Sequence, residues 1–500
     1  MSTQAFEVAV GDLVPNGRAI GSREIKVSPM SHVQRLFVFS LAMLTKLFTN
    51  LEAIPGMGTM STGCCCVLAE SLESLWLLFA ALACVGLMLG LSTWGYLEYA
   101  ALVICMLLQI PLSLAYLAHR WLVQRHPENW VVTLAFPCIN TTLWILSSLF
   151  LPIGSVGSPA YDLAGQAVIL TQCAAWFGRS GLTFVLSWLA AAGAHRFVRP
   201  TSKKGFRIAL ATLFLLCIAG GARFYAPTAF MGRAFVPPGG QPDEYYRISC
   251  LSNVNDMYGE TQRRLEAGDT IVMHSELATA TFRATSGAYQ EVLAKHYEKT
   301  QIQALIVLCF SKEGRSWYNL VTKDGTVMSY AKNHPVPILE SSLKPGDSPP
   351  SVVESLKVGR ASSRNISVTG TICFDTDFPQ VTRALSAADV LLESSETWSN
   401  IGRQHLHGHQ YAALENGQTV IKCTRHGFSG AINPYGSIVV QLPQTTRAVI
   451  SFMVPRFPKL TVFPALYTAF DTVMGVSACF WLVLALVPRL SSRWLGDGHL

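Results

Sequence analysis

Long apolar runs dominate the first half of the chain and return near its end, whereas the stretch between them alternates apolar and polar positions. The apolar runs occupy residues 33–225 and 467–488, and residues 240–460 have the periodicity of a soluble α/β protein. Runs of roughly 17–25 apolar residues can cross a bilayer as helices. The pattern therefore predicts a multi-span α-helical membrane protein with one large water-facing domain inserted before the last span.

We predict about eight transmembrane helices from the length of these runs. The first run carries Arg35 and Lys46 and is the least apolar, and the fifth is short. The predicted spans are 33–52, 70–92, 97–118, 130–152, 160–177, 180–197, 206–224 and 467–488. Residues 1–30 have no apolar segment followed by a small-residue cleavage site, so we predict no removable signal peptide.

The chain divides at changes in composition. We predict an N-terminal segment at 1–32, a seven-span region at 33–225, a Gly- and Pro-rich linker at 226–244 and an α/β domain at 245–460. Residues 461–500 form the last span and a short tail in this interpretation. Within the domain, roughly eight or nine strands and four helices indicate layers of sheet and helix.

Two local predictions complete this description of the domain. The runs at 437–442 and 448–454 are expected to pair as a late hairpin, because both are strand-like and close together in the chain. The stretch 341–355, rich in Ser and Pro, is expected to be an exposed loop.

The distribution of Lys and Arg sets the expected orientation. These residues gather before the first span, between the sixth and seventh spans, and after the last one. Basic residues are retained on the cytoplasmic side of membranes, so we expect a cytoplasmic N-terminus and an extracytoplasmic or luminal domain. Only 14% of the residues are charged, where soluble domains have about 25%. The net charge of +7 reflects topology, and without a basic stripe interleaved with aromatic residues no nucleic-acid partner is expected.

Thirteen cysteines are present, mostly in or beside the predicted spans. A run of three, Cys64 to Cys66, could be acylated, although small residues at the entrance of a span are the more common explanation. Four cysteines lie in the domain without Cys-x-x-Cys spacing, so neither a disulfide framework nor a zinc site is expected.

Three ionisable residues stand where predicted strands of the domain end. Glu276 ends the run TIVMHSE, Lys332 follows MSYA, and Cys373 ends ISVTGTIC. In such a set the carboxylate accepts the thiol proton, the thiolate attacks an acyl carbon, and the ammonium stabilises the oxyanion. The alternative is a buried Glu–Lys ion pair beside an inert, buried cysteine.

The segments "HSELA", "YAKNHPVPILES" and "GTICFDTDFP" surround these three residues. In this order they resemble the motifs of the apolipoprotein N-acyltransferase family, within the nitrilase or carbon–nitrogen hydrolase superfamily, and the chain looks like a divergent member. The resemblance is specific over about 250–440. It implies seven spans, an outward nitrilase-like αββα sandwich domain and one final span.

The resemblance also implies roles for individual residues. Cys373 takes the place of the nucleophile, Glu276 of the general base and Lys332 of the residue that stabilises the oxyanion. Glu340 falls where the family has a second glutamate that orients the lysine. Asp375 stands in place of a glutamate that follows the nucleophile.

Other positions depart from the family pattern. "SETW" stands at 395–398, where the family has "ND" before the tryptophan that corresponds to Trp398. Trp398 is a candidate supporting residue that could stack on a substrate, although an aromatic residue of the core is the more common explanation. "IL" replaces "FG" before the second glutamate, and His274-Ser275 precedes Glu276. These departures concern the pockets for the acceptor and the leaving group.

Three functions are compatible with these features. The first is a membrane N-acyltransferase that takes an acyl chain from a phospholipid through a cysteine thioester and passes it to an amine, such as that of a lipidated protein, without a cofactor. The second is a membrane-anchored carbon–nitrogen hydrolase of the amidase type, with water as acceptor. The third is a non-catalytic scaffold or transporter. The resemblance favours the first.

Two further motifs have simpler explanations. His405, His407 and His409 alternate in "HLHGH", but positions i and i+2 of a helix do not share a face, so we predict no metal site. Asn365-Ile-Ser is a glycosylation sequon that matters only in a eukaryotic luminal domain.

Overall fold

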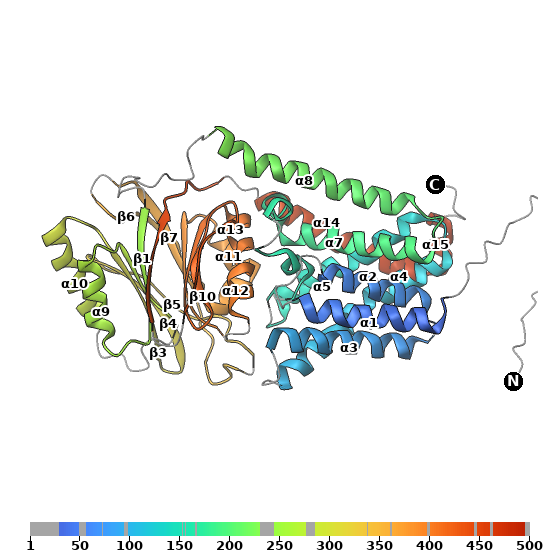
Figure 1. The fold of residues 1–500 in the computed structure, drawn as a ribbon, viewed down its shortest axis with the longest axis horizontal. Helices are drawn as coiled ribbons and strands as arrows, with labels where there is room; N and C mark the ends of the chain where they lie inside the picture. Colours follow the sequence, from blue (N-terminus) through green and yellow to red (C-terminus); the bar gives the residue numbers. More distant parts are fainter. Residues whose placement is uncertain are drawn as a thin grey trace, which may run out of the picture.

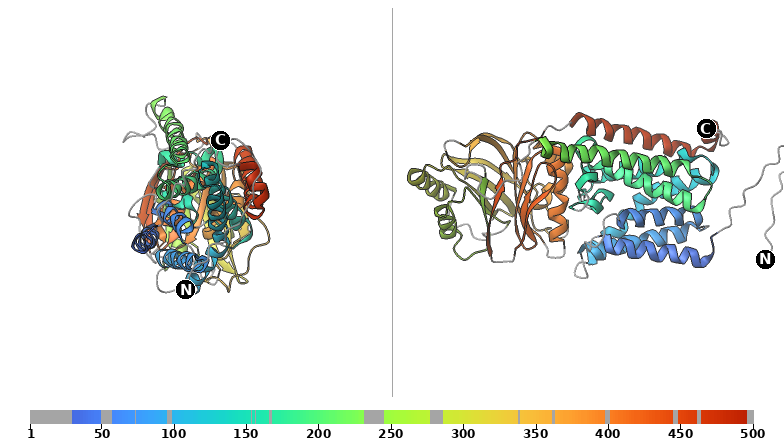
Figure 2. Two further views of the ribbon diagram at one scale, coloured as in Figure 1. Left: turned by 90° about the vertical axis from the view of Figure 1, so that its right-hand side faces the viewer. Right: turned by 45° about the horizontal axis from the view of Figure 1, so that its top comes forward.

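The computed structural model consists of a helical bundle and an α/β domain seated on one end of it, as both orientations show (Figure 1, Figure 2). The structure describes residues 30–49, 57–72, 74–94, 99–152, 154–155, 157–165, 168–230, 245–276, 286–337, 339–360, 363–397, 401–444, 448–460 and 464–495.

The bundle is built from apolar helices that pack around small side chains. Ala42, Cys65, Cys66 and Ala115 are almost fully buried in its core, where their small size lets neighbouring helices approach closely. The helices are α1 (His32–Thr49), α2 (Met57–Ser71), α3 (Leu75–Trp94), α4 (Tyr99–Arg125), α5 (Ala135–Phe150), α6 (Val168–Thr171), α7 (Ala174–Val198), α8 (Lys204–Phe230), α14 (Pro464–Leu486) and α15 (Pro488–Leu495).

Four of the described helical segments are long and apolar enough to cross a membrane by length and composition. They are Trp130–Phe150, Ala174–Val198, Lys204–Phe224 and Pro464–Leu486. These segments agree with the predicted spans at 130–152, 180–197, 206–224 and 467–488. The total of about eight spans stays a prediction.

The predicted span at 160–177 is wrong. The chain there forms a short 3-10 helix, η2 (Pro159–Leu163), and the single turn of α6 before α7 begins. Gly165 and Gly178 both have positive φ, of 75° and 65°, which interrupts a continuous helix. The predicted span at 70–92 also differs from the structure, because its first residues belong to the end of α2 and the rest to α3. α2 escaped prediction because Ser, Thr and Gly dilute its hydropathy.

The domain contains two six-stranded sheets that face each other. Their orders are β12-β1-β2-β3-β4-β5 and β11-β10-β9-β8-β7-β6, with parallel pairing at β1-β2-β3 and β7-β8-β9. The strands are β1 (Tyr245–Ser252), β2 (Ile271–His274), β3 (Leu305–Lys312), β4 (Arg315–Thr322), β5 (Gly325–Ala331), β6 (Val353–Lys357), β7 (Asn365–Ile372), β8 (Val390–Glu396), β9 (Thr419–Arg425), β10 (Phe428–Ile432), β11 (Ile438–Pro443) and β12 (Ala448–Pro455).

Helices cover the outer face of each sheet, which makes four layers. α9 (Met257–Glu266) and α10 (Ser286–Thr300) cover the first sheet. The second sheet is covered by α11 (Pro379–Ala384), α12 (Gly402–Gly408) and α13 (Gln410–Asn416), which lie between it and the bundle (Figure 1). The inferred αββα sandwich is therefore confirmed.

Three details of the domain differ from the prediction. β11 and β12 do not form a hairpin, because β11 pairs with β10 in one sheet and β12 pairs with β1 in the other. β6 begins within the stretch expected to be an exposed loop and pairs with β7. β4 and β10 were not predicted, so the described strands outnumber the predicted eight or nine. Pairing partners are set by the whole sheet, and proximity in the chain does not reveal them.

Candidate active site

The candidate site lies where strands of the two facing sheets end. Glu276 follows β2 in the first sheet, and Lys332 follows β5 at the edge of that sheet. Cys373 follows β7 in the second sheet and begins the 3-10 helix η4 (Cys373–Asp377). Runs rich in Ile, Val and Thr form these strands because branched side chains fill the space between two sheets. The polar residues then stand where the strands stop.

Cys373 has an unusual backbone conformation. Its φ is +47°, a value that residues other than glycine rarely adopt and that tends to occur at functional sites. The thiol donates a hydrogen bond to the backbone carbonyl of Glu396 at 3.3 Å, and the residue is 2% exposed. The sharp change from strand to 3-10 helix therefore holds the sulfur at the end of the sheet.

Lys332 lies between two carboxylates. Its Nζ donates to Glu276 Oε1 at 2.9 Å and to Glu340 Oε1 at 2.8 Å. The second oxygen of Glu340 accepts the backbone N–H of Val336 at 2.6 Å, which fixes that side chain. Lys332 and Glu276 are buried, so both charges depend on these contacts.

The main chain of Glu396 joins the two halves of the site. Its N–H donates to Glu276 Oε2 at 3.3 Å, while its carbonyl accepts the Cys373 thiol. The structure therefore brings the thiol and the predicted base to one residue at the end of β8. Sequence reasoning noted the altered "SE" here but missed this backbone contact, which only the tertiary structure reveals.

Asp375 connects the cysteine turn to the lysine loop. Its buried carboxylate accepts the backbone N–H groups of Asn333 at 3.1 Å and His334 at 2.7 Å, immediately after Lys332. Asp375 thereby holds the lysine loop against the helical turn that begins at Cys373. The supporting prediction for Trp398 lies outside the described residues.

Burial and the surrounding charges determine the protonation states. Burial raises the pKa of the Cys373 thiol well above its usual value, and Lys332 opposes this effect. Burial also raises the pKa of Glu276, to about 7, against the attraction of Lys332 and with the repulsion of Glu340. Burial lowers the pKa of Lys332, but Glu276, Cys373 and Glu340 outweigh it and raise that pKa well above normal. The site at neutral pH thus has an ammonium, a thiol and a carboxyl group poised to act as a base.

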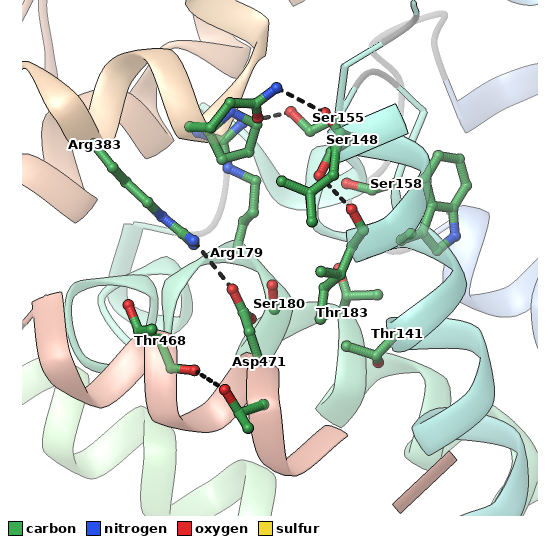
Figure 3. Close-up of a pocket in the computed structure, with 16 residues that line it drawn as sticks. Thr141, Ser148, Ser155, Ser158, Arg179, Ser180, Thr183, Arg383, Thr468 and Asp471 are labelled. Atoms are coloured by element: carbon green, nitrogen blue, oxygen red, sulfur yellow. Dashed lines mark hydrogen bonds and ion pairs between the residues drawn. The ribbon is translucent and has the colours of Figure 1, made fainter. Parts of the chain in front are cut away.

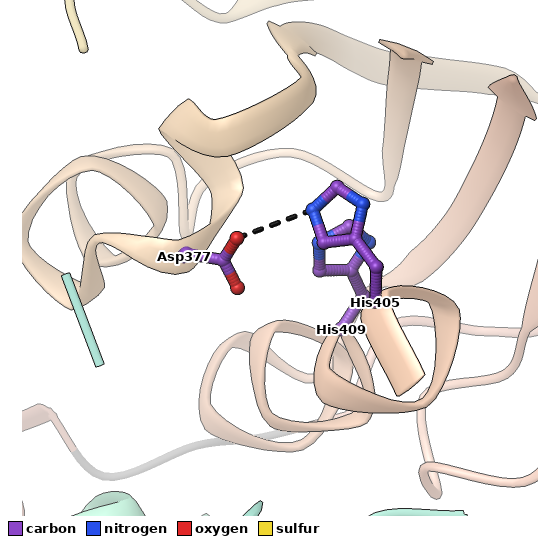
Figure 4. A group of neighbouring side chains, drawn as sticks. All are labelled: Asp377, His405 and His409. Carbon is purple, nitrogen blue, oxygen red and sulfur yellow. Dashed lines mark ion pairs between the residues drawn. The ribbon is translucent and has the colours of Figure 1, made fainter. Parts of the chain in front are cut away.

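A second buried cluster lies behind the cysteine turn (Figure 4). His405 Nε2 lies 3.2 Å from Asp377 Oδ2, and His409 Nδ1 lies 2.6 Å from Glu393 Oε2. Asp377, His405 and His409 have the composition of a metal site. The prediction of no metal site rested on the alternation of the histidines along one helix, whereas Asp377 comes from η4.

Lys422 argues against a metal at this cluster. Its Nζ donates to Glu393 Oε1 at 2.6 Å and to Ser395 Oγ at 3.3 Å, and it lies 3.0 Å from His405 Nδ1. An ammonium can only donate, so His405 Nδ1 accepts and the ring proton is on Nε2, facing Asp377. That nitrogen has no lone pair for a metal. The ammonium thus supplies the positive charge of the cluster.

Comparisons with known proteins identify the class of the domain. Residues 266–456 match the family described as Carbon-nitrogen hydrolase. Among solved structures, an amidase from Nesterenkonia sp. is 17% identical in sequence to this chain. The aligned region covers 43% of this chain and 92% of the amidase, with a TM-score of 0.34. The family match places a carbon–nitrogen hydrolase domain in this chain.

The curated relatives are apolipoprotein N-acyltransferases. That of Haemophilus influenzae is 24% identical over 387 residues, which cover 69% of this chain and 71% of the relative. That of Pseudomonas paraeruginosa is 42% identical over 84 residues, so the match spans only 16% of that protein's length. The resemblance to the apolipoprotein N-acyltransferase family, in the nitrilase superfamily, is thus confirmed.

Proposed function

We propose that the chain is a membrane-embedded N-acyltransferase that carries an acyl chain from a phospholipid to an amine through a thioester on Cys373. One observation carries the proposal: a buried lysine is held between two carboxylates beside a buried cysteine at the end of a strand. The arrangement is found in a carbon–nitrogen hydrolase domain whose curated relatives are named apolipoprotein N-acyltransferases.

The first half-reaction forms the thioester. Glu276 accepts the thiol proton as Cys373 Sγ bonds to the ester carbonyl carbon of the lipid. Lys332 stabilises the negative charge that develops on the carbonyl oxygen. When the tetrahedral intermediate collapses, the carbon–oxygen bond to the lysolipid breaks, and Glu276 returns the proton to the departing oxygen.

The second half-reaction transfers the acyl group. An amine attacks the thioester carbonyl, Glu276 accepts a proton from the nitrogen, and the carbon–sulfur bond breaks to give an amide. The sulfur leaves as a thiolate that regains its proton from Glu276. The acceptor is an amine, and a lipid-modified protein fits both the name of the relatives and the membrane setting.

The apolar bundle supports a lipid donor. A two-chain lipid seldom leaves the bilayer, so an enzyme that acts on it gains from lying in the membrane plane. We place the N-terminus in the cytoplasm and the domain on the extracytoplasmic or luminal side, following the distribution of basic residues. The proposed division remains 1–32, 33–225, 226–244, 245–460 and 461–500.

The alternative is an amidase-type hydrolase, which the description of the domain family favours. It shares the thioester and differs only in the acceptor, which is water. The fate of the acyl group therefore distinguishes the two functions.

Mass spectrometry of the purified protein, incubated with a diacyl phospholipid in detergent, tests the proposal. We expect a long-chain acyl adduct on the peptide that contains Cys373, discharged by a peptide amine with formation of an amide. Cys373→Ser should lose the adduct. Cys423→Ser is the matched control, because this buried cysteine also donates to a backbone carbonyl but lies on β9.

Two results would count against acyl transfer. Discharge of the adduct by water at the same rate with and without amine would favour the hydrolase. An adduct on another cysteine, or none with lipid while small amides are hydrolysed, would refute the lipid thioester at Cys373.

A further inference from the structure

A cavity of about 370 Å³ lies between the bundle and the domain (Figure 3). Helices α5, α7 and α14 form its bundle side, and α11 of the domain closes it with Arg383. Serine and threonine hydroxyls from all three bundle helices line it. Cys373, Glu276 and Lys332 are not among its lining residues, so this cavity is separate from the candidate active site.

The cavity opens toward the side of the bundle. Leu149, near the end of α5, is half exposed, and Thr468 and Thr472 on the first turns of α14 are exposed. These positions are beside the domain, so in the proposed membrane orientation they lie at the level of the lipid headgroups. The hydroxyls of Thr468 and Thr472 donate to backbone carbonyls of α14, and their oxygens can still accept a hydrogen bond from a headgroup at this level.

The charged residues that line the cavity, taken together with Glu415 behind them, sum to zero. Arg179 pairs with Glu415 at 3.1 Å, and Arg383 pairs with Asp471 at 3.0 Å. Figure 3 shows Arg383 and Asp471 reaching toward one another from the domain and from α14. A site with balanced charges gains little from a net anion or a net cation, whereas a zwitterion can satisfy both signs.

Arg383 and Asp471 both retain unused hydrogen-bonding capacity. A guanidinium has five N–H donors, and that of Arg383 uses one on Asp471 Oδ2. Its Nε faces Glu415 Oε2 at 3.5 Å, so the remaining donors are on the two terminal nitrogens. The Ser180 hydroxyl also lies against the Asp471 carboxylate, whose buried Oδ1 makes no contact of full hydrogen-bond geometry among the described residues. A donor surplus and an acceptor surplus therefore lie side by side in one cavity.

We propose that this cavity binds the headgroup of a zwitterionic phospholipid, a phosphodiester that bears a primary ammonium, as a resident lipid. The phosphodiester oxygens accept from Arg383, and the ammonium donates to Asp471 Oδ1 and to the hydroxyls. A trimethylammonium headgroup has no N–H to donate, and an anionic glycerol headgroup lacks the cation. The bound lipid joins α11 of the domain to α14 of the bundle.

This inference depends on the membrane embedding in the proposed function but not on acyl transfer. It predicts a lipid that is retained and chemically unchanged. A failure to form a thioester on Cys373 would therefore leave it intact, and absence of the resident lipid would leave the acyl-transfer proposal intact.

Native mass spectrometry of the full chain in detergent tests the site, with lipids that carry the same acyl chains but ethanolamine, choline or glycerol headgroups. We expect the ethanolamine lipid to be retained about tenfold more strongly than the other two, because one charge-assisted hydrogen bond is lost with each. The same lipid should raise the thermal unfolding midpoint, since a ligand that binds only the folded state stabilises it. Free phosphoethanolamine is tested separately and should raise the thermal unfolding midpoint less than the lipid does.

Asp471→Asn keeps the size of the side chain and should remove the preference for the ethanolamine lipid. Asp347→Asn is the matched control, because that exposed carboxylate pairs with Arg315, does not line the cavity and should leave retention unchanged. If Asp471→Asn lowers the unfolding midpoint without lipid, Thr472→Val, at the cavity mouth, tests the same preference. Equal retention of the three lipids by the wild type, an unchanged preference in both cavity variants, or an equal shift from free phosphoethanolamine would overturn the proposal.

Discussion

Glu340→Gln offers a quantitative test of the electrostatics of the site. The substitution removes one negative charge and keeps the shape of the side chain. Glu276 Oε1 and Glu340 Oε1 both lie within hydrogen-bond distance of Lys332 Nζ, at 2.9 and 2.8 Å. At a separation of about 5 Å and an effective dielectric constant of about 20, the two carboxylates repel by about 3 kcal/mol, or roughly two pKa units.

The substitution should therefore lower the pKa of Glu276 from about 7 by one to two units, because ionisation no longer meets a neighbouring negative charge. The ionised carboxylate is the form that accepts a proton, so the acid limb of the reaction should move to lower pH by the same amount. The rate at the plateau should fall, because the bond from Lys332 to this side chain is no longer between two charges and the Gln NH2 group cannot accept the N–H of Val336.

The assay is the rate of alkylation of Cys373 by iodoacetamide between pH 5 and about 9, a range that brackets the expected transition. Peptide mass spectrometry separates this cysteine from the others. Glu354→Gln, on exposed β6, provides the control. An acid limb that stays near pH 7 in Glu340→Gln, or that moves upward, would refute the proposed repulsion.

Three further tests concern groups around the site and the contact between bundle and domain. Lys422→Met leaves Glu393 buried without its cation and should lower the free energy of unfolding by about 3–5 kcal/mol. Lys422→Arg should lower it less, and an unchanged thermal midpoint in Lys422→Met would contradict this prediction. Asp375→Ala releases the lysine loop and should slow acylation of Cys373 by about 10²-fold with the fold retained, while Asp375→Asn keeps part of the rate. Acylation of Asp375→Ala at the wild-type rate would show that the loop needs no such support. A double-mutant cycle of Arg179→Gln and Glu415→Gln should give a coupling of about 1–3 kcal/mol in thermal unfolding, and additive effects would argue against this pair joining bundle and domain.

The sequence pointed to the candidate site because the ends of strands are visible in it. Runs of branched residues stop at Glu276, Lys332 and Cys373, and polar residues at such points need a partner or a function. The layered architecture follows from the same alternation of strands and helices. These predictions depend only on the local pattern of apolar and polar residues, which a single sequence is enough to show.

The parts that failed depend on distant partners. Neither the role of the Glu396 backbone nor the contact of Asp377 with His405 has a signature in local spacing, because each joins segments of different strands and helices. The same reason explains β11 and β12, which are neighbours in sequence but belong to different sheets. Hydropathy likewise misjudged the region around Gly178, since a window average does not register a single residue with positive φ.

The rate of acyl-adduct formation on Cys373 in a single turnover with phospholipid tests the central claim most directly. Glu276→Gln removes the base but keeps an oxygen that can accept from Lys332. We predict a rate about 10²- to 10⁴-fold below that of the wild type, as expected when a general base is lost. An adduct that forms at the wild-type rate in Glu276→Gln would show that this carboxylate takes no proton from the thiol.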